Sequence, residues 1–301
     1  QALSYLTEIY WKEEEPEENL ADFMIYMLFF MKFLSGPIER ARDMLPQLKS
    51  GKPVAYPSIV YGMKLIVVGL IKKLILADYI SPYIDGIFNS IHTASGIQLL
   101  MACLLYPVEL YGDFSGYTDI ALGGACMLGF KLSPNFNRPF IAQTTAEFWR
   151  RWHITLGRWF REYVYIPLGG NRKGKARTIF NLFVVWSLTA VWHGAEGHFL
   201  IWGASLLLLL ALEKAFLLQF LKKSKILSHV YLVLVVPLTW MAFAIADVGQ
   251  LGVYYARMFP FFGVGETVRQ MDFLQYLKDY GPLFLMGIVF STPYPTALYK
   301  V

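Results

Sequence analysis

Long apolar runs separated by short polar stretches dominate the pattern of the chain. Eight runs stand out, at residues 22–35, 57–78, 96–111, 116–130, 178–192, 199–220, 228–246 and 281–291. A helix needs about 20 mostly apolar residues to cross a bilayer, and it satisfies its own backbone hydrogen bonds in lipid. Because no alternating strand pattern is present, the sequence predicts an all-α, polytopic transmembrane bundle. Segment 252–280 is mixed and aromatic, which predicts an interfacial helix or a loop.

Composition supports the bilayer as the solvent. The chain is 56% hydrophobic and only 16% charged, whereas an average soluble domain carries about 25% charged residues. We expect residues 1–301 to form a single membrane-embedded domain. Gln1 already lies in an apolar-aromatic stretch, so we expect N-terminal helices that complete the bundle to be missing from this fragment.

Positive charge is concentrated in residues 131–177. This block holds ten Lys or Arg and two acidic residues, a net charge of +8 against +5 for the whole chain. The positive-inside rule places such a block, and the second cluster at Lys222, Lys223 and Lys225, on the cytoplasmic side. The block is also rich in Trp, Phe and Tyr, which favours a helix at the lipid headgroups over a nucleic-acid interface. Membrane lipid is therefore an expected partner, and nucleic acid is not.

The two basic clusters flank residues 178–220, which we expect to form a helical hairpin. Its first arm, Thr178 to Trp192, has 15 residues and would rise about 22 Å, short of the ~30 Å hydrocarbon core. The turn at residues 193–198 would then lie within the membrane depth. Polar backbone is tolerated there only if it is buried in protein or lines a wet cavity.

His193 is the main candidate for chemistry, because an ionisable side chain at membrane depth is costly and commonly functional. Imidazole titrates near neutral pH, so it can take a proton from a hydroxyl and return one to a leaving group. A hydrogen-bonded histidine at the end of a helix is the structural alternative. His153 is the second candidate, and its alternative is a place in an interfacial helix anchored by Trp and Arg.

Asp113 and Asp119 interrupt an otherwise apolar stretch. Carboxylates in such a place mark a polar pocket, a partner for arginine or an ion path. We expect Asp113 to be buried and paired with Arg138, Arg150 or Arg151. The nearby Gly112 and Gly116 predict an irregular bend between two membrane segments.

Several common catalytic motifs are absent. The chain has no HExxH, CxxC, GxSxG or phosphate-cradling glycine loop, which argues against zinc proteases, thiol redox enzymes, α/β-hydrolases and nucleotide hydrolases. Cys103 and Cys126 lie in apolar surroundings without a spaced set of metal ligands. We therefore expect metal-free chemistry with no bound cofactor.

Five motifs, taken in order, carry a resemblance to a known family. They are Ser35-Gly36-Pro37-Ile38-Glu39-Arg40, Gly112-Asp113-Phe114-Ser115-Gly116-Tyr117, Asn135-Phe136-Asn137-Arg138-Pro139-Phe140, Glu147-Phe148-Trp149-Arg150-Arg151-Trp152-His153 and Val191-Trp192-His193-Gly194. Together they resemble the membrane-bound O-acyltransferase family. The stretch Tyr165 to Asn171 is most similar to the bacterial alginate O-acetyltransferase branch. After Trp240, where such proteins usually continue to a Phe-Arg pair, this chain reads Met241-Ala242-Phe243.

The resemblance implies a set of roles. His193 would be the essential histidine and His153 the second functional histidine. Substrate binding would fall to Asp113, Asn137, Arg138, Trp149, Trp152 and Trp192. The acyl donor would be a cytoplasmic thioester, acetyl-coenzyme A. The acceptor would be an extracellular polysaccharide or a periplasmic or extracellular acetyltransferase partner protein, and the chain would be a multi-pass protein of the cell (inner) membrane.

Two alternatives remain open from the sequence. D-alanyl transfer to teichoic acids uses related enzymes with the same Trp-His pattern, and the stretch Pro167 to Asn171 favours acetyl transfer over it. A transporter or channel with a path through Asp113, Asp119 and His193 is the alternative of a different class. The polar residues cluster in one turn and one basic block without an inverted repeat, which argues against transport.

Overall fold

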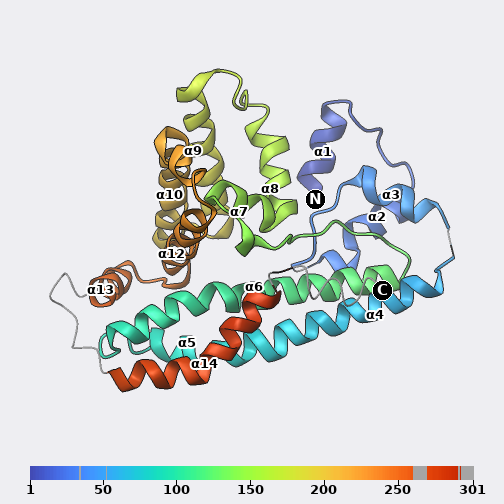
Figure 1. Ribbon diagram of the computed structural model, residues 1–301. Helices are drawn as coiled ribbons and strands as arrows, with labels where there is room; N and C mark the ends of the chain where they lie inside the picture. The colour runs from blue at the N-terminus through green and yellow to red at the C-terminus, as the bar shows by residue number, and fades with distance from the viewer. Residues whose placement is uncertain (34, 52, 260–269, 291, 293–301) are drawn as a thin grey trace.

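The computed structural model describes residues 1–33, 35–51, 53–259, 270–290 and 292. All regular elements of this part of the chain are helical, as the sequence predicts (Figure 1). In chain order they are α1 (Ala2–Tyr10), α2 (Leu20–Leu28), η1 (Phe30–Lys32), α3 (Ala41–Lys49), α4 (Tyr56–Leu70), η2 (Ile71–Ala77), α5 (Asp78–Phe88), α6 (Gly96–Met127), η3 (Pro139–Ile141), α7 (Thr145–Arg151), α8 (Ile154–Phe160), η4 (Arg161–Tyr165), α9 (Gly174–His193), α10 (Gly197–Leu212), η5 (Glu213–Leu217), α11 (Leu218–Leu221), α12 (Lys225–Ala244), α13 (Val248–Met258) and α14 (Gln270–Phe290).

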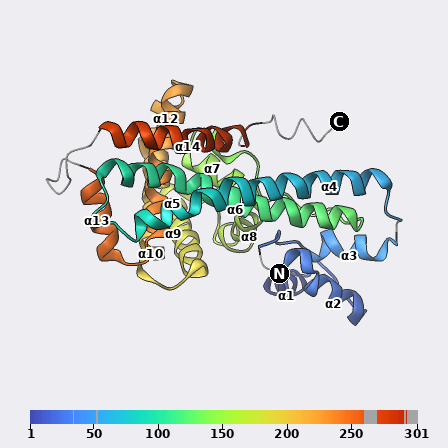
Figure 2. The same ribbon diagram turned by 90° about the horizontal axis from the view of Figure 1, so that it is seen from below.

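A long pair of helices forms the base of the molecule. One member is α4, continued by the π-helical segment η2 and by α5, and the other is α6, which runs antiparallel to it. Figures 1 and 2 show α12 and α13 against the N-terminal half of α6, with α9 and α10 on the same side of the base, whereas α1, α2 and α3 lie toward its C-terminal half. The base therefore links two groups of helices that are far apart in the chain.

Glycines allow α4 and α6 to approach closely. A Cβ atom on Gly62 would lie 2.5 Å from the carbonyl oxygen of Gly123, and one on Gly69 would lie 2.5 Å from that of Gly116. Both glycines of each helix are seven residues apart, so they return to the same face. Small residues at a helix interface are typical of packing in membranes, where close van der Waals contact replaces the hydrophobic effect.

The predicted bend between residues 111 and 116 is wrong. α6 is one continuous helix of 32 residues, and Gly112 and Gly116 are helical positions packed against the backbone of η2 and α4. The glycines serve helix contact, and the carboxylates that interrupted the apolar pattern are paired with lysines of η2. The helix can therefore continue through them.

The predicted hairpin of residues 178–220 is confirmed by the packing of α9 against α10. Its first arm is longer than expected, because α9 begins at Gly174 and has 20 residues, a rise of about 30 Å. The premise of a short arm is therefore wrong. Three helical stretches of the described residues are long and apolar enough to cross a membrane, namely Gly96–Met127, Gly197–Leu221 and Lys225–Ala244.

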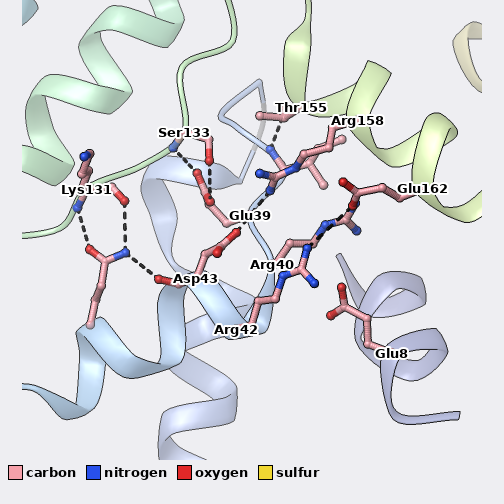
Figure 3. A network of polar contacts seen from close by, with 12 residues as sticks. Glu8, Glu39, Arg40, Arg42, Asp43, Lys131, Ser133, Thr155, Arg158 and Glu162 are labelled. Carbon is pink, nitrogen blue, oxygen red and sulfur yellow. Dashed lines mark hydrogen bonds and ion pairs between the residues drawn. The ribbon is translucent and has the colours of Figure 1, made fainter. Parts of the chain in front are cut away.

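A polar network joins the N-terminal helices to the loop and helices that follow α6 (Figure 3). Glu39 accepts hydrogen bonds from the backbone and hydroxyl of Ser133. Arg40, whose side chain is 1% exposed, forms an ion pair with Glu162 of η4 at 2.8 Å. The motif at residues 35–40 is thereby fixed to the chain around residues 133–162.

Residues 252–280 were predicted to form an interfacial helix or a loop. The structure places α13 over Val248–Met258 and the first half of α14 over the end of this range. Residues 260–269 lie outside the described part of the chain. Tyr254 of α13 is fully buried and donates a hydrogen bond to the carbonyl oxygen of Leu99, so α13 is tied to the start of α6.

We predict that Gly69→Ala lowers the unfolding temperature, whereas Gly86→Ala does not. At Gly69 the added carbon would meet a backbone carbonyl at 2.5 Å, and at Gly86 it would meet no atom within 4 Å. Overpacking costs about 1–3 kcal/mol, while Gly→Ala in an open helical site gains about 0.5–1 kcal/mol. Thermal unfolding in detergent micelles measures both. Equal shifts for the two variants would contradict the close contact of α4 and α6.

Candidate active site

Helix α7 carries the first half of the site, and its N-terminus is held by two side chains. Thr144 caps the helix by accepting a hydrogen bond from the backbone N–H of Glu147 at 3.0 Å. Glu213 of η5, only 1% exposed, accepts from the backbone N–H groups of Thr145 at 2.6 Å and Ala146 at 3.3 Å. A carboxylate is favourable at a helix N-terminus, where N–H groups lack partners within the helix. Glu213 therefore fixes α7 against the α10–α11 segment.

His153 lies at the turn between α7 and α8. Its backbone is left-handed, with φ of 45°, a conformation that is uncommon outside glycine and collects at functional sites. Its Nδ1 atom lies 3.3 Å from Oδ1 of Asn135, and the next residue donates its backbone N–H to the carbonyl oxygen of Asn135. The loop before η3 therefore dictates where this imidazole lies.

His193 is the last residue of α9 and lies among aromatic rings. Its ring centroid is 5.0 Å from Trp202, 5.1 Å from Phe243 and 6.1 Å from Phe199. A Cβ atom at the following Gly194 would lie 2.5 Å from the ring of Phe199. Glycine is therefore needed there, since any larger residue would displace an aromatic wall of this histidine.

The two histidines belong to one site. Trp192 lies edge-on to both rings, at 6.0 Å from His153 and 4.8 Å from His193. Burial lowers the pKa of His153 to about 3, and the nearby His193 contributes to that shift. His153 is consequently a neutral imidazole near pH 7. The fold brings together two residues that the sequence separates by 40 positions.

A cluster of tryptophans packs next to this site. Trp149 packs against Trp186, Trp202 and Trp240 at 5.2–5.6 Å. Trp152, 3% exposed, lies 5.2 Å from Trp240 and 5.0 Å from Phe136. Edge-to-face aromatic pairs contribute about 0.5–1.5 kcal/mol each beyond burial, so the cluster holds α7, α9, α10 and α12 rigidly around the histidines.

The residues predicted to bind substrate fall into different places. Trp192 is 54% exposed beside both histidines, whereas Trp152 is a buried part of the core. Asn137 contacts Arg151 through its backbone N–H and carbonyl groups, and Arg138, which directly precedes η3, has a left-handed backbone. Trp192 is thus the member of the set best placed to meet a ligand.

The burial and the ion-pair partner of Asp113 differ from the prediction. Its carboxylate was expected to be buried and paired with an arginine, but it lies 2.6 Å from Lys73 and its side chain is 49% exposed. Asp119 is the less exposed carboxylate: it pairs with Lys72 at 2.7 Å, and the two side chains are only 16% and 10% exposed. Lys72 and Lys73 lie inside the apolar run 57–78, and their carboxylate partners are on another helix, so the sequence does not reveal the pairing.

Two further residues were missed from the sequence as site residues. Asn135 and Glu213 are 0% and 1% exposed, and each accepts three hydrogen bonds that hold the elements around His153. Glu213 carried a usable signal, since a lone carboxylate inside an apolar segment is costly. For Asn135 the sequence offers no signal beyond its place in a motif, because its hydrogen-bond partners are distant in the sequence.

Comparison with known proteins shows the family of the chain. Residues 16–248 match the membrane-bound O-acyltransferase family, a range that holds both histidines, and the chain belongs to that family. It is therefore a membrane protein.

The chain is similar to several acyltransferases of bacteria. The protein called "Probable alginate O-acetylase AlgI" of Azotobacter vinelandii is 37% identical over 262 residues, which cover 87% of this chain and 52% of that protein. The peptidoglycan O-acetyltransferase of Helicobacter pylori is 40% identical over 62% of this chain and 36% of its own length. The teichoic acid D-alanyltransferase of Bacillus subtilis is 31% identical over 64% of this chain and 50% of its own. The chain spans about half the length of the first of these relatives.

We predict that Asp119→Asn destabilises the protein far more than Asp113→Asn. Removing one partner of a buried ion pair costs about 3–5 kcal/mol, whereas an exposed pair contributes about 0–1 kcal/mol. Thermal unfolding of the two matched variants in detergent measures the difference. Comparable losses would show that the two carboxylates are equivalent and that the burial of Asp119 has no energetic consequence.

Proposed function

We propose that this protein is an O-acyltransferase that moves an acetyl group from a thioester donor, acetyl-coenzyme A, to a hydroxyl group. The observation that carries the proposal is the ring of Trp192 lying against both His153 and His193, in an aromatic site of a chain from this family. Imidazole is suited to proton transfer near neutral pH. The apolar walls around His193 keep water from competing with the acceptor hydroxyl for the acyl group.

His193 acts as the general base in this proposal. Its unprotonated ring nitrogen takes the proton of the acceptor hydroxyl as the oxygen attacks the thioester carbonyl carbon. The tetrahedral intermediate collapses, the C–S bond breaks, and the thiolate takes the proton back from the imidazolium of His193. His153 orients the acceptor or stabilises developing charge. A covalent acyl-histidine formed on His193 is the alternative route through the same residue.

The proposed direction of transfer is from the cytoplasm outward. The basic block at residues 131–177 supports a cytoplasmic position for the entrance used by the donor. The acceptor is then a hydroxyl of an extracellular polysaccharide, reached directly or through a periplasmic or extracellular acetyltransferase partner. The names of the alginate and peptidoglycan relatives support a polymer acceptor. The protein would act as a multi-pass component of the cell (inner) membrane.

D-alanyl transfer is a second candidate, because teichoic acid D-alanyltransferases of two organisms are 31% and 29% identical to this chain. Purified protein given radiolabelled acetyl-coenzyme A separates the candidates. Acetyl transfer or donor hydrolysis supports the first, and a response only to a D-alanyl thioester supports the second. A transporter should consume neither donor.

We predict that His193→Ala inserts and folds normally but loses acyl transfer by about 10²- to 10⁴-fold, because the proton acceptor is gone. His153→Ala should lose less if that residue orients or stabilises charge. Transfer is measured in membranes at matched expression. His92→Ala is the control, since this histidine is exposed in the turn before α6. Near-normal transfer by His193→Ala would show that the turn after α9 is structural and that the assignment is wrong.

A further inference from the structure

Asn135 lies at the centre of a hydrogen-bond chain that ends on His153. Its side-chain oxygen accepts from the backbone N–H of Thr155 at 3.1 Å and from the Thr155 hydroxyl at 2.7 Å. That hydroxyl in turn accepts from the backbone N–H of Ile38 at 3.0 Å. The chain therefore joins the motifs at residues 35–40, 135–140 and 147–153 through one buried amide.

These contacts determine which way the amide faces. The two ends of an asparagine amide are hard to tell apart by shape alone, so the hydrogen-bond partners must assign them. A backbone N–H can only donate, so the end of the amide that faces the N–H of Thr155 must be an acceptor, and the Thr155 hydroxyl can donate to the same atom while it accepts from Ile38. The end of Asn135 that faces Thr155 is therefore the carbonyl oxygen Oδ1.

The same oxygen then determines which ring nitrogen of His153 carries the proton. Oδ1 can only accept, and it lies 3.3 Å from Nδ1 of the imidazole. We propose that Asn135 is a positioning residue that holds neutral His153 as the Nδ1–H tautomer, which leaves the lone pair on Nε2. The proposal goes beyond the catalytic assignment of the histidines, and its kinetic consequence rests on that assignment.

Two local costs point to the same contact. Nδ2 of Asn135 is buried and has no hydrogen-bond partner in the described parts of the chain, and an unsatisfied buried donor destabilises the fold. His153 has a left-handed backbone, which is also unfavourable for a residue other than glycine. Such costs persist where the surrounding structure imposes them, and they collect at functional sites.

The tautomer matters for the transfer reaction because only one ring nitrogen remains available. The rings of Phe114 and Trp192 pack edge-on to His153, at 4.8 and 6.0 Å. With Nδ1 occupied by Asn135, Nε2 is an acceptor and can orient a substrate hydroxyl through its proton. The opposite tautomer would present an N–H group there instead and repel that proton.

The test is the ¹⁵N spectrum of the purified protein with labelled histidine, in which a protonated ring nitrogen and one with a lone pair resonate far apart. The signal of His153 among the five histidines is assigned by its loss in His153→Gln. We expect Nδ1 protonated and Nε2 unprotonated. Asn135→Leu, of similar size but without an acceptor, should give a mixture of tautomers, and Asn135→Asp, which keeps an acceptor, should restore the Nδ1–H form.

Asn181→Leu is the matched control. Asn181 is also 0% exposed, with one end of its amide bonded to the carbonyl oxygen of Gly170 and the other without a partner in the described chain. It lies in α9, outside the chain of hydrogen bonds to His153. Its replacement should carry a comparable folding cost and leave the His153 spectrum unchanged.

Kinetics provide the second readout. Asn135→Leu should lower kcat at least tenfold, toward the ~10⁴-fold loss that follows when a catalytic histidine is held in the wrong tautomer, with little change in KM for the donor. Any wild-type state of His153 other than Nδ1–H overturns the proposal, even if Asn135→Leu fails to fold. An unchanged spectrum in a folded Asn135→Leu also overturns it. If His193→Ala stays active while the tautomer result holds, the assignment of His193 as the general base fails and the role of Asn135 stands.

Discussion

The buried amide of Asn135 is the interaction on which the candidate site depends. It links the segment before α3, the loop after α6 and the turn between α7 and α8, and residues up to 117 positions apart in the sequence are joined in this way. A buried polar group must find partners or cost about 1–3 kcal/mol. Because the side chain of Asn135 makes its hydrogen bonds through one oxygen, a shift of the segments around it would disturb the same set of bonds.

Aromatic packing provides the second constraint. Trp149 and Trp240 connect α7 to α12, and Trp202 extends the same cluster to His193 at the end of α9. Closely packed rings leave little freedom for a helix to slide, so the relative position of the two histidines is fixed by the core. The close contacts of Gly62 and Gly69 with α6 fix the helix pair that forms the base of the molecule.

Much of this arrangement could be predicted from the sequence, and the failures have physical causes. Apolar runs gave the helices and the hairpin of α9 and α10 because burial in lipid demands them. The continuity of α6 through Asp113 could not be read locally, since its charge is balanced by Lys73 from another helix. The start of α9 at Gly174 was missed because its first turn is basic. The roles of Asn135 and Glu213 arise only from tertiary hydrogen bonds.

The central claim is that His153 and His193 work as one site, and a double-mutant cycle on acyl transfer tests it most directly. Rates are measured for His153→Ala, His193→Ala and the double variant, at matched amounts of folded protein. Residues that act as a unit give strongly non-additive losses. The account predicts that the double variant is no slower than His193→Ala alone. Losses that multiply would contradict it, because they would show that the two histidines act independently.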